Sequence, residues 1–338
     1  MIIPFVKCRR LVVAMFCFSI VTHVCAQFTA NISHSDLNTR HQLFNRFEVG
    51  ISAGSTGLGV DVATNITDNF RLRAGVDYMP RFTFPMSFSL QSYTDGGVNS
   101  ENFDKMQKYM EGLTGIKVDD RIDIDGKPTM TSFKLLVDVY PWPEKGWRFT
   151  AGFYIGSRKI AKAINTMGEM PSLLAVNIYN HFYDYIMSDD AYDKPIGGVN
   201  FDPFLIDEIR EKLESEGRMG IHIGDFKDGS PYMMQPDSDG MVKATAFVNA
   251  FKPYLGLGYT STLDKKGRFK LDVDCGMMMW GGSPTLITHD GVDLTSEVKN
   301  IKGKPGDYVD VLKAFKVYPT VGTVSYTHLR AHETVLDL

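Results

Sequence analysis

The chain has 338 residues, of which 43% are hydrophobic, 22% are charged and 12% are aromatic. This composition excludes a disordered chain, a collagen-like chain and a small disulfide-stapled scaffold. The net charge of −4 excludes the strongly basic surface that is typical of nucleic-acid binding. After residue 26 there is no apolar run of the roughly 18 residues that a membrane-spanning helix needs, whereas a membrane-spanning barrel stays compatible.

The first 26 residues have the pattern of an export signal. Lys7, Arg9 and Arg10 precede a mostly apolar stretch over 11–21, and Ala26 is a small residue at the expected cleavage point. The apolar stretch is shorter than the roughly 20 residues of a membrane anchor, so we expect cleavage after Ala26. We expect residues 27–45 to form a periplasmic lead-in. Cleavage leaves Cys275 as the one thiol, which excludes an intramolecular disulfide.

The other end of the chain has a different character. The segment from Val324 to Thr334 resembles the translated read-through of a transposon-type sequencing adapter. The resemblance implies that residues 324–338 are not part of the natural protein, and a natural polar tail is the alternative. On the first interpretation, His328 and His332 contribute to no metal site.

Between these ends, hydrophobic residues recur with a period of two. Phe47, Val49 and Ile51, for example, alternate with small or polar residues, which places an apolar row on one face of a strand. The pattern predicts an all-β fold with about eight antiparallel strands, the last of them partial. The predicted strands cover residues 47–54, 58–63, 70–78, 133–140, 147–155, 252–259, 268–277 and 316–321.

The links between these strands alternate in length. Apart from a tight turn at 54–57, the links at one end are long, over 81–130, 157–249 and 281–315. The links at the other end are short turns. A compact soluble domain rarely needs three long loops at one end, whereas transmembrane barrels combine short turns with long outward loops. The spacing therefore predicts a transmembrane barrel over 46–323, and a soluble lipocalin-like barrel is the alternative.

The polar faces of the predicted strands carry charges of both signs. An eight-stranded barrel has an interior that side chains just fill, and unpaired charges there would cost several kcal/mol each. We therefore expect a plugged polar lumen with one ion-pair network. Its predicted members are Glu48, Asp61, Arg71, Arg73, Asp77, Asp138, Arg148, Asp272 and Asp274.

Aromatic residues gather near the predicted strand ends. Two such groups are typical of the girdles that mark the membrane interfaces of transmembrane barrels. The predicted interface residues are Phe47, Phe70, Tyr78, Phe133, Trp147, Phe149, Phe251, Tyr259, Phe269 and Trp280.

Three segments carry a family resemblance: 56–67, 72–80 and 251–259. They resemble the outer-membrane β-barrel proteins of Gram-negative bacteria, a porin-like superfamily, and particularly the uncharacterised kind abundant in Bacteroidetes. The resemblance covers the strands, about a third of the chain. It implies a place in the cell outer membrane and contact with outer-membrane lipid and the barrel-assembly machinery. Family members usually end on a strand with a final aromatic residue, which is missing after Val321 and fits the adapter interpretation.

The long links contain two predicted helices. Apolar residues at spacings of four predict an amphipathic helix over 171–187; they are Leu174, Ile178, Phe182 and Ile186. A second helix is predicted over 203–216, with Asp202 as cap and Gly217 as stop. They form either an extracellular cap that binds an unknown ligand or a pair that packs together over the barrel mouth.

Candidates for metal binding and catalysis are weak. Asp119, Asp120, Asp123 and Asp125 before Gly126 depart from the spacing of a calcium loop, so we expect a solvated turn there, and likewise at Asp237 and Asp239. The histidines are scattered without the close pairings of zinc sites or hydrolase dyads. We expect no catalytic residue, no metal and no cofactor.

Three functions follow, in order of preference. The first is a non-enzymatic surface protein with a binding, adhesion or envelope-stabilising role. The second is a porin-like passage for small solutes. The third is a rim-located outer-membrane enzyme that uses Ser157, His222 and His289.

Overall fold

The computed structural model describes residues 47–94, 97–99, 103–193, 202–264, 269–301, 304–314 and 316–329. All of them belong to one compact unit, Leu43–Leu338. The predicted signal, the lead-in over 27–45 and residues 330–338 of the predicted tail lie outside the described residues.

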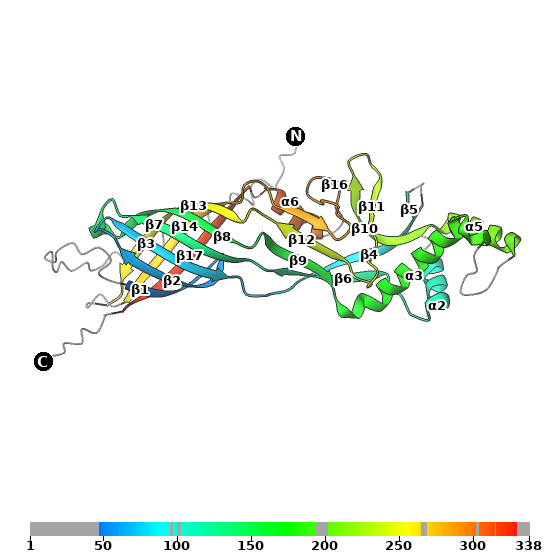
Figure 1. The fold of residues 1–338 in the computed structure, drawn as a ribbon, viewed down its shortest axis with the longest axis horizontal. Coiled ribbons are helices and arrows are strands. Elements are labelled where there is room, and N and C mark those ends of the chain that lie inside the picture. Colours follow the sequence, from blue (N-terminus) through cyan, green and yellow to red (C-terminus); the bar gives the residue numbers. More distant parts are fainter. Residues whose placement is uncertain are drawn as a thin grey trace, which may run out of the picture. The chain divides into compact units, whose positions relative to one another are not determined.

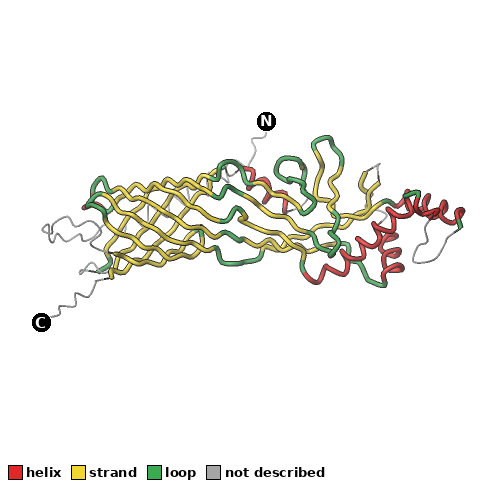
Figure 2. Tube along the Cα trace, in the orientation of Figure 1, coloured by secondary structure: helices red, strands yellow, loops and turns green. Residues whose placement is uncertain are grey.

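Eight antiparallel strands close into a barrel, which confirms the predicted fold class (Figures 1 and 2). Around the barrel their order is β1-β17-β14-β13-β8-β7-β3-β2. The bounds are β1 Phe47–Gly54, β2 Gly57–Asn65, β3 Phe70–Tyr78, β7 Thr131–Val139, β8 Trp147–Gly156, β13 Phe251–Thr262, β14 Phe269–Met279 and β17 Val317–Leu329.

The closing strand β17 is longer than predicted. It pairs with β1 as far as Phe47 opposite Leu329, and with β14 as far as Phe269 opposite Thr327. Residues 324–329, the start of the segment predicted as foreign, therefore form part of the strand that closes the barrel. Their foreign origin stays a prediction.

The long links are partly helical, as predicted, but they also contain strands that were not predicted. They contribute a second, nine-stranded sheet with the order β11-β10-β4-β6-β9-β12-β15, in which β16 pairs with β10 and β5 pairs with β4. The bounds are β4 Phe84–Thr94, β5 Gly97–Asn99, β6 Arg121–Pro128, β9 Lys159–Asn165, β10 Arg218–Phe226, β11 Pro231–Met234, β12 Lys243–Phe247, β15 Thr285–Thr288 and β16 Val298–Lys299.

Backbone hydrogen bonds run without a break from the barrel into this sheet. The amide of Met79 donates to the carbonyl of Met130 at 2.9 Å, and that of Thr129 donates to Ile160 at 2.9 Å. The sheet thus grows out of the barrel strands, and Figure 2 shows the chain passing from one into the other. Because β6 takes part in this pairing, the solvated turn predicted at 119–126 is wrong.

Helices cover the second sheet. They are α2 Phe103–Thr114, α3 Met170–Met187, α4 Asp190–Asp193, α5 Pro203–Glu216 and α6 Lys304–Ala314, with the 3₁₀ turns η1 Pro143–Lys145 and η2 Met167–Glu169. The helices predicted over 171–187 and 203–216 are confirmed. The carboxylate of Asp202 accepts from the amide of Phe204 at 2.8 Å, which satisfies one donor at the start of α5.

Helices α3 and α5 pack against each other, as one of the two alternatives predicted, but they lie on the second sheet and not over the barrel mouth (Figure 1). The side chain of Asn180 donates to the carbonyl of Met219 at 2.8 Å and accepts from its amide at 2.9 Å. The hydroxyl of Tyr179 donates to the carbonyl of Gly217 at 2.8 Å. Burial, with a further contribution from Tyr183, raises the pKa of Tyr179, so the hydroxyl keeps its proton.

The sheet and its helices share a hydrophobic core of their own. Leu173 and Val176 of α3 pack there with Met106 of α2 and with Ile221 of β10. Leu174 and Ile178, part of the stripe on which the helix was predicted, are instead partly exposed. Within the described ranges, no helix is both long and apolar enough to cross a membrane.

Candidate functional site: a charged and sealed barrel lumen

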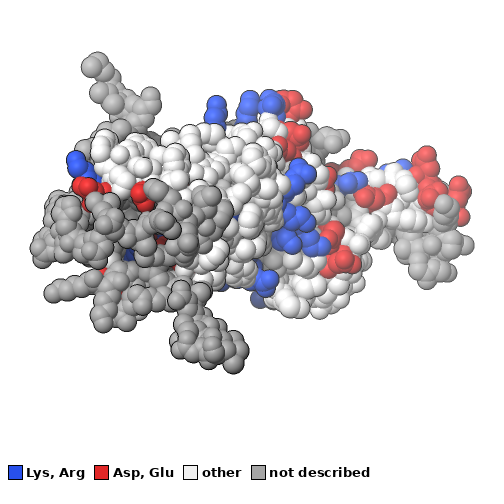
Figure 3. Space-filling view, turned by 60° about the vertical axis from the view of Figure 1, so that its left-hand side comes forward, with Lys and Arg blue, Asp and Glu red and all other residues white. Residues whose placement is uncertain are grey.

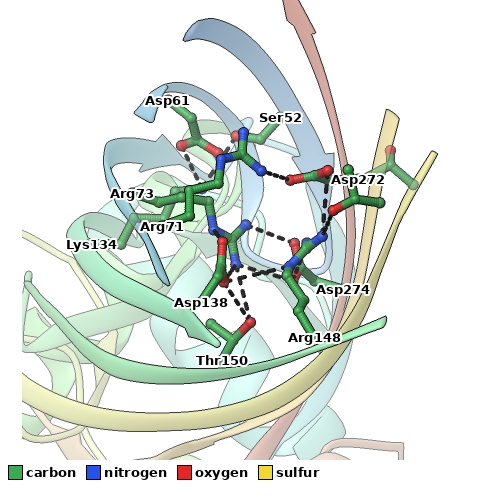
Figure 4. A network of polar contacts seen from close by, with 12 residues as sticks. Ser52, Asp61, Arg71, Arg73, Lys134, Asp138, Arg148, Thr150, Asp272 and Asp274 are labelled. Atoms are coloured by element: carbon green, nitrogen blue, oxygen red, sulfur yellow. Dashed lines mark hydrogen bonds and ion pairs between the residues drawn. The ribbon is translucent and has the colours of Figure 1, made fainter. Parts of the chain in front are cut away.

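All nine residues of the predicted network lie on the inward faces of the barrel strands and form ion pairs there, and Figure 4 labels seven of them. The ion pairs form two groups, one around Arg71, Arg73 and Arg148 and one around Lys134. Two cations join them that were not among the predicted members, Lys134 of β7 and Lys270 of β14. Both lie on the polar rows of their strands, so the alternation that predicted the other nine as inward residues also predicts these two.

Arg73 and Arg148 share their carboxylates. Arg73 Nε lies 2.7 Å from Asp138 Oδ2, and its Nη1 lies 2.8 Å from Asp274 Oδ2. Arg148 Nη2 lies 2.8 Å from the other oxygen of Asp274. The hydroxyl of Thr150 donates to Asp138 at 2.7 Å. Each arginine is thus fixed from more than one strand.

Arg71 forms a second centre nearer the short-turn end. Its guanidinium lies 2.5 Å from Glu48 Oε2 and 2.8 Å from Asp272 Oδ2, and it stacks 4.4 Å from the centroid of the Tyr326 ring. Lys270 Nζ holds the other oxygen of Glu48 at 2.7 Å.

Lys134 forms ion pairs with two carboxylates at once. Its Nζ lies 2.8 Å from Asp61 Oδ1 and 2.8 Å from Asp77 Oδ1. Two glycines make room for these carboxylates. A Cβ on Gly75 would lie 2.0 Å from Asp61 Oδ1, and one on Gly59 would lie 2.3 Å from Asp77 Oδ1.

The network therefore holds six carboxylates against five cations, and its pairs are almost completely buried. Side-chain exposure is 2% for Arg73 and 0% for Arg148, and it is 0% for Asp138. Loss of one partner would leave an uncompensated buried charge, which destabilises a protein by about 3–5 kcal/mol. The network runs from Glu48 near one rim to Asp77 near the other, so it fills much of the lumen.

An apolar cluster, which we call the plug, lies at the end of the lumen where the long links begin. The plug consists of Leu136, Tyr154, Val248, Tyr254, Met278 and Trp280, with Ile160 and Tyr318 packed against it. The rings of Tyr154 and Tyr254 meet edge to face at 5.5 Å.

The prediction that Trp280 lies at the membrane interface is wrong. It is only 6% exposed, whereas a girdle residue would face outward. The reason is parity, since the buried Met278 precedes it by two positions and the outward residues of β14 are Met277 and Met279. Trp280 therefore falls on the inward row.

Between the network and the plug there is a small cavity. Its volume is about 40 Å³, and Arg73, Lys134, Tyr154, Asp274 and Thr320 are among the residues that line it. A buried water needs roughly 10–15 Å³ measured in this way, so the cavity has room for a few water molecules.

The outward faces of the barrel strands are uncharged and mostly apolar. Among the described residues of the eight strands, no Asp, Glu, Lys or Arg lies on an outward row. Figure 3 shows this surface as a broad uncharged area. Cys275 lies on it.

The other predicted interface aromatics face outward or lie half-buried at the surface. Tyr259 is half-buried and meets Trp147 edge to face at 5.3 Å. Those exposed by 44–53% are Phe47, Phe70, Tyr78, Phe133, Trp147, Phe149, Phe251 and Phe269.

One strip of the outer surface is polar. Along β17, the outward residues Thr323, Ser325 and Thr327 follow the apolar Val321. Ser325 is paired with Ile51 on one side and with Leu271 on the other. The polar strip coincides closely with the start of the segment predicted as foreign.

The candidate residues for catalysis each have a separate partner. Ser157 Oγ donates to the carbonyl of Lys159, His222 Nδ1 lies 3.1 Å from the side-chain oxygen of Gln91, and His289 Nδ1 lies 3.4 Å from the amide of Lys243. In the part of the chain that the structure describes, no hydrogen bond joins Ser157, His222 and His289. Nor does that part contain a group of three or more His, Cys, Asp or Glu able to hold a metal ion.

Comparisons with known proteins give no family. No protein-family model matches the chain, and no curated protein matches it. Several solved structures are similar to it, among them the following three crystal structures. CarO2 of Acinetobacter baumannii is 12% identical, with 85% of this chain and 100% of that chain covered and a TM-score of 0.35. CarO of the same organism is 11% identical, with coverages of 86% and 100% and a TM-score of 0.36.

The third similar structure is a major outer membrane protein from Thermus thermophilus. It is 11% identical, with 84% of this chain and 98% of that chain covered and a TM-score of 0.26. These TM-scores are too low to assign a fold or a function, and the barrel is assigned from the pairing of its own strands.

Proposed function

We propose that this protein is an outer-membrane β-barrel with a closed lumen, which carries a folded domain outside the membrane. The observation that supports a membrane location is the contrast between the two barrel faces. The outward rows are uncharged, whereas the inward rows hold a buried ion-pair network. An apolar exterior around a polar interior is the arrangement of transmembrane barrels.

Cell fractionation tests this location. We expect the full chain in the outer-membrane fraction, released only by detergent. Recovery from the soluble periplasm without detergent would overturn the membrane location and favour the soluble barrel.

For the role, we propose surface binding, adhesion or stabilisation of the cell envelope, without enzymatic activity. The second sheet and helices α2, α3 and α5 support this role, because they form a domain with its own hydrophobic core, larger than the links of a bare barrel. Outer-membrane lipid, the barrel-assembly machinery and an extracellular ligand of unknown identity are the proposed partners.

Porin-like passage of small solutes is the second candidate. The network and the plug argue against it, because together they occupy the lumen from Glu48 to Trp280. Conductance across a planar bilayer decides between the two roles. Purified protein should give no steady current, and steady open currents would reverse the order.

A rim enzyme is the third candidate. Substituting His222→Ala and His289→Ala should leave unchanged any hydrolytic activity that is detected on lipid or peptide substrates. Loss of such an activity in either variant would revive this candidate.

A further inference from the structure

Cations stand at the end of the uncharged barrel surface from which the long links depart. The first charged residue beyond β3 is Arg81, beyond β8 it is Arg158, and before β17 it is Lys316. Before β7 it is Lys127. In the link before β13 the nearest charged residue is Lys243, and in the link after β14 it is Asp290.

The opposite end of the barrel differs. Among the described residues, its turns carry both signs, with Asp68, Glu144, Lys145 and Asp264. Figure 3 shows Lys and Arg side chains where the uncharged surface ends, with some Asp and Glu side chains among them. The positive charge is therefore a property of one rim.

We call Arg81, Lys127, Arg158, Lys159, Lys162 and Lys316 the cationic collar. Lys127 pairs with Asp125, with 3.2 Å between Nζ and Oδ2. The other five are exposed, and none of them forms an ion pair within the described ranges. The collar thus carries positive charge that the protein itself does not balance.

Two members of the collar oppose each other directly. Lys127 of β6 and Lys162 of β9 are partners in the antiparallel register. Like charges at such positions are destabilising, because the Cβ atoms of directly opposed residues lie only about 5 Å apart. An anion that lies between the two ammonium groups would relieve this repulsion.

We propose that the collar binds the phosphates of lipid headgroups in the leaflet at this rim. The inference rests on the proposed membrane location, which sets the boundary of the uncharged surface at headgroup depth. Lysine and arginine can lay their apolar stems along such a boundary and hold their charges among the headgroups. Anionic lipid attracts clustered cations near the membrane surface, which supplies the binding energy.

The test uses full-length protein in nonionic detergent and diphosphorylated lipid A as the probe. The collar variant combines Lys127→Gln, Arg158→Gln, Lys159→Gln and Lys162→Gln. The matched control removes four exposed lysines of the second domain, through Lys105→Gln, Lys108→Gln, Lys117→Gln and Lys227→Gln. Native mass spectrometry gives the apparent Kd of each protein for lipid A and for the same lipid without phosphates.

We expect the collar variant to bind lipid A at least about tenfold more weakly than wild type, while the control stays within about twofold. Removal of the phosphates should weaken binding to wild type by a similar factor. Equal affinity of the collar variant and wild type would overturn the proposal, and so would equal affinity for the two lipids.

A second variant tests the proposal through an expected gain in affinity for lipid A. Asp125→Asn removes the acid paired with Lys127, so it should tighten the binding of lipid A by about two- to fivefold, and unchanged or weaker binding contradicts the proposal. Failure of the membrane location is distinguishable, because it shows as solubility without detergent before any lipid is added.

Discussion

The indole ring of Trp280 stacks on the ring of Tyr318, with 4.9 Å between the ring centroids and 13° between the planes. The contact joins the end of β14 to the start of β17. The hydroxyl of Tyr318 also donates to the carbonyl of Ser55 at 2.6 Å, so the pair reaches the turn between β1 and β2. The plug thus connects several strands at the end of the lumen where the long links begin.

Trp280→Ala should therefore destabilise the barrel. Truncation of a buried tryptophan lowers the free energy of unfolding by about 3–5 kcal/mol. The removed atoms no longer gain free energy from burial, and the cavity that they leave is unfavourable. Urea unfolding in detergent measures the change. Trp142→Ala is the control, since Trp142 is 57% exposed, and it should change the free energy of unfolding by less than about 0.5 kcal/mol. Equal effects of the two substitutions would contradict the role of the plug.

Lys134→Met should be as damaging, because it leaves Asp61 and Asp77 without their shared cation. The expected loss is about 3–5 kcal/mol of unfolding free energy. Adding Asp61→Asn and Asp77→Asn to the same protein should restore part of the lost unfolding free energy. Unfolding curves of the single and combined variants, compared in a mutant cycle, measure this coupling. Lys145→Met in the exposed turn η1 serves as control. Additive effects of the three lumen substitutions would rule out the coupling.

The polar strip of β17 offers a stabilising change. Ser325→Val places an apolar side chain between Ile51 and Leu271 on the outward surface, so it should raise the free energy of unfolding in lipid by about 1 kcal/mol. Val321→Thr, on the same row, should lower it by a similar amount. Unfolding in lipid vesicles measures both changes. A neutral or destabilising Ser325→Val would argue against a lipid-facing strip.

Asp293 lies in the turn after β15, and we expect it to make the stability of the second domain depend on pH. Burial acts to raise the pKa of Asp293, but hydrogen bonds from the hydroxyl and amide of Thr295 and from the hydroxyl of Ser296 outweigh it and lower the pKa. A group with a lowered pKa stabilises the folded state above its ordinary pKa of 3.8 and loses that contribution as the pH falls.

Asp293→Ala should accordingly be less stable than wild type at pH 7 by about 1 kcal/mol, and the difference should shrink as the pH falls below about 4. Thermal unfolding of both proteins across this range measures it. Asp239→Ala, in an exposed turn, is the control and should change the free energy of unfolding at pH 7 by less than about 0.5 kcal/mol. A difference that does not change with pH would exclude the charged form of Asp293 as its source.

The barrel could be predicted from the sequence because alternation there has a clear physical cause on both faces. Apolar residues such as Ile51 and Leu257 face outward, and charges such as Arg73 and Asp274 pair inside, where an unpaired charge would be costly. The same parity identifies Lys134 and Lys270 as inward residues, and it places Trp280 inside as well. These three were recoverable from the period alone.

The second sheet was harder to predict. β4 does alternate, with Phe84, Met86 and Phe88 on one row. Strands such as β9, whose sequence is KIAKAIN, carry no such signal, because their partners lie far away in the sequence and the backbone pairing fixes them. Which face of α3 is buried also depends on the second sheet that it packs against. Leu173 and Val176 are buried there, and Leu174 is exposed.

The continuity of the barrel with the second sheet has a mechanical consequence. β6 and β9 pair with each other and lead into β7 and β8 through only a few residues. A pull on the outer domain along these strands would act across their interstrand hydrogen bonds, which lie perpendicular to the strand direction and would be sheared together. Such a load passes directly into the barrel wall, because no flexible tether separates β6 and β9 from it.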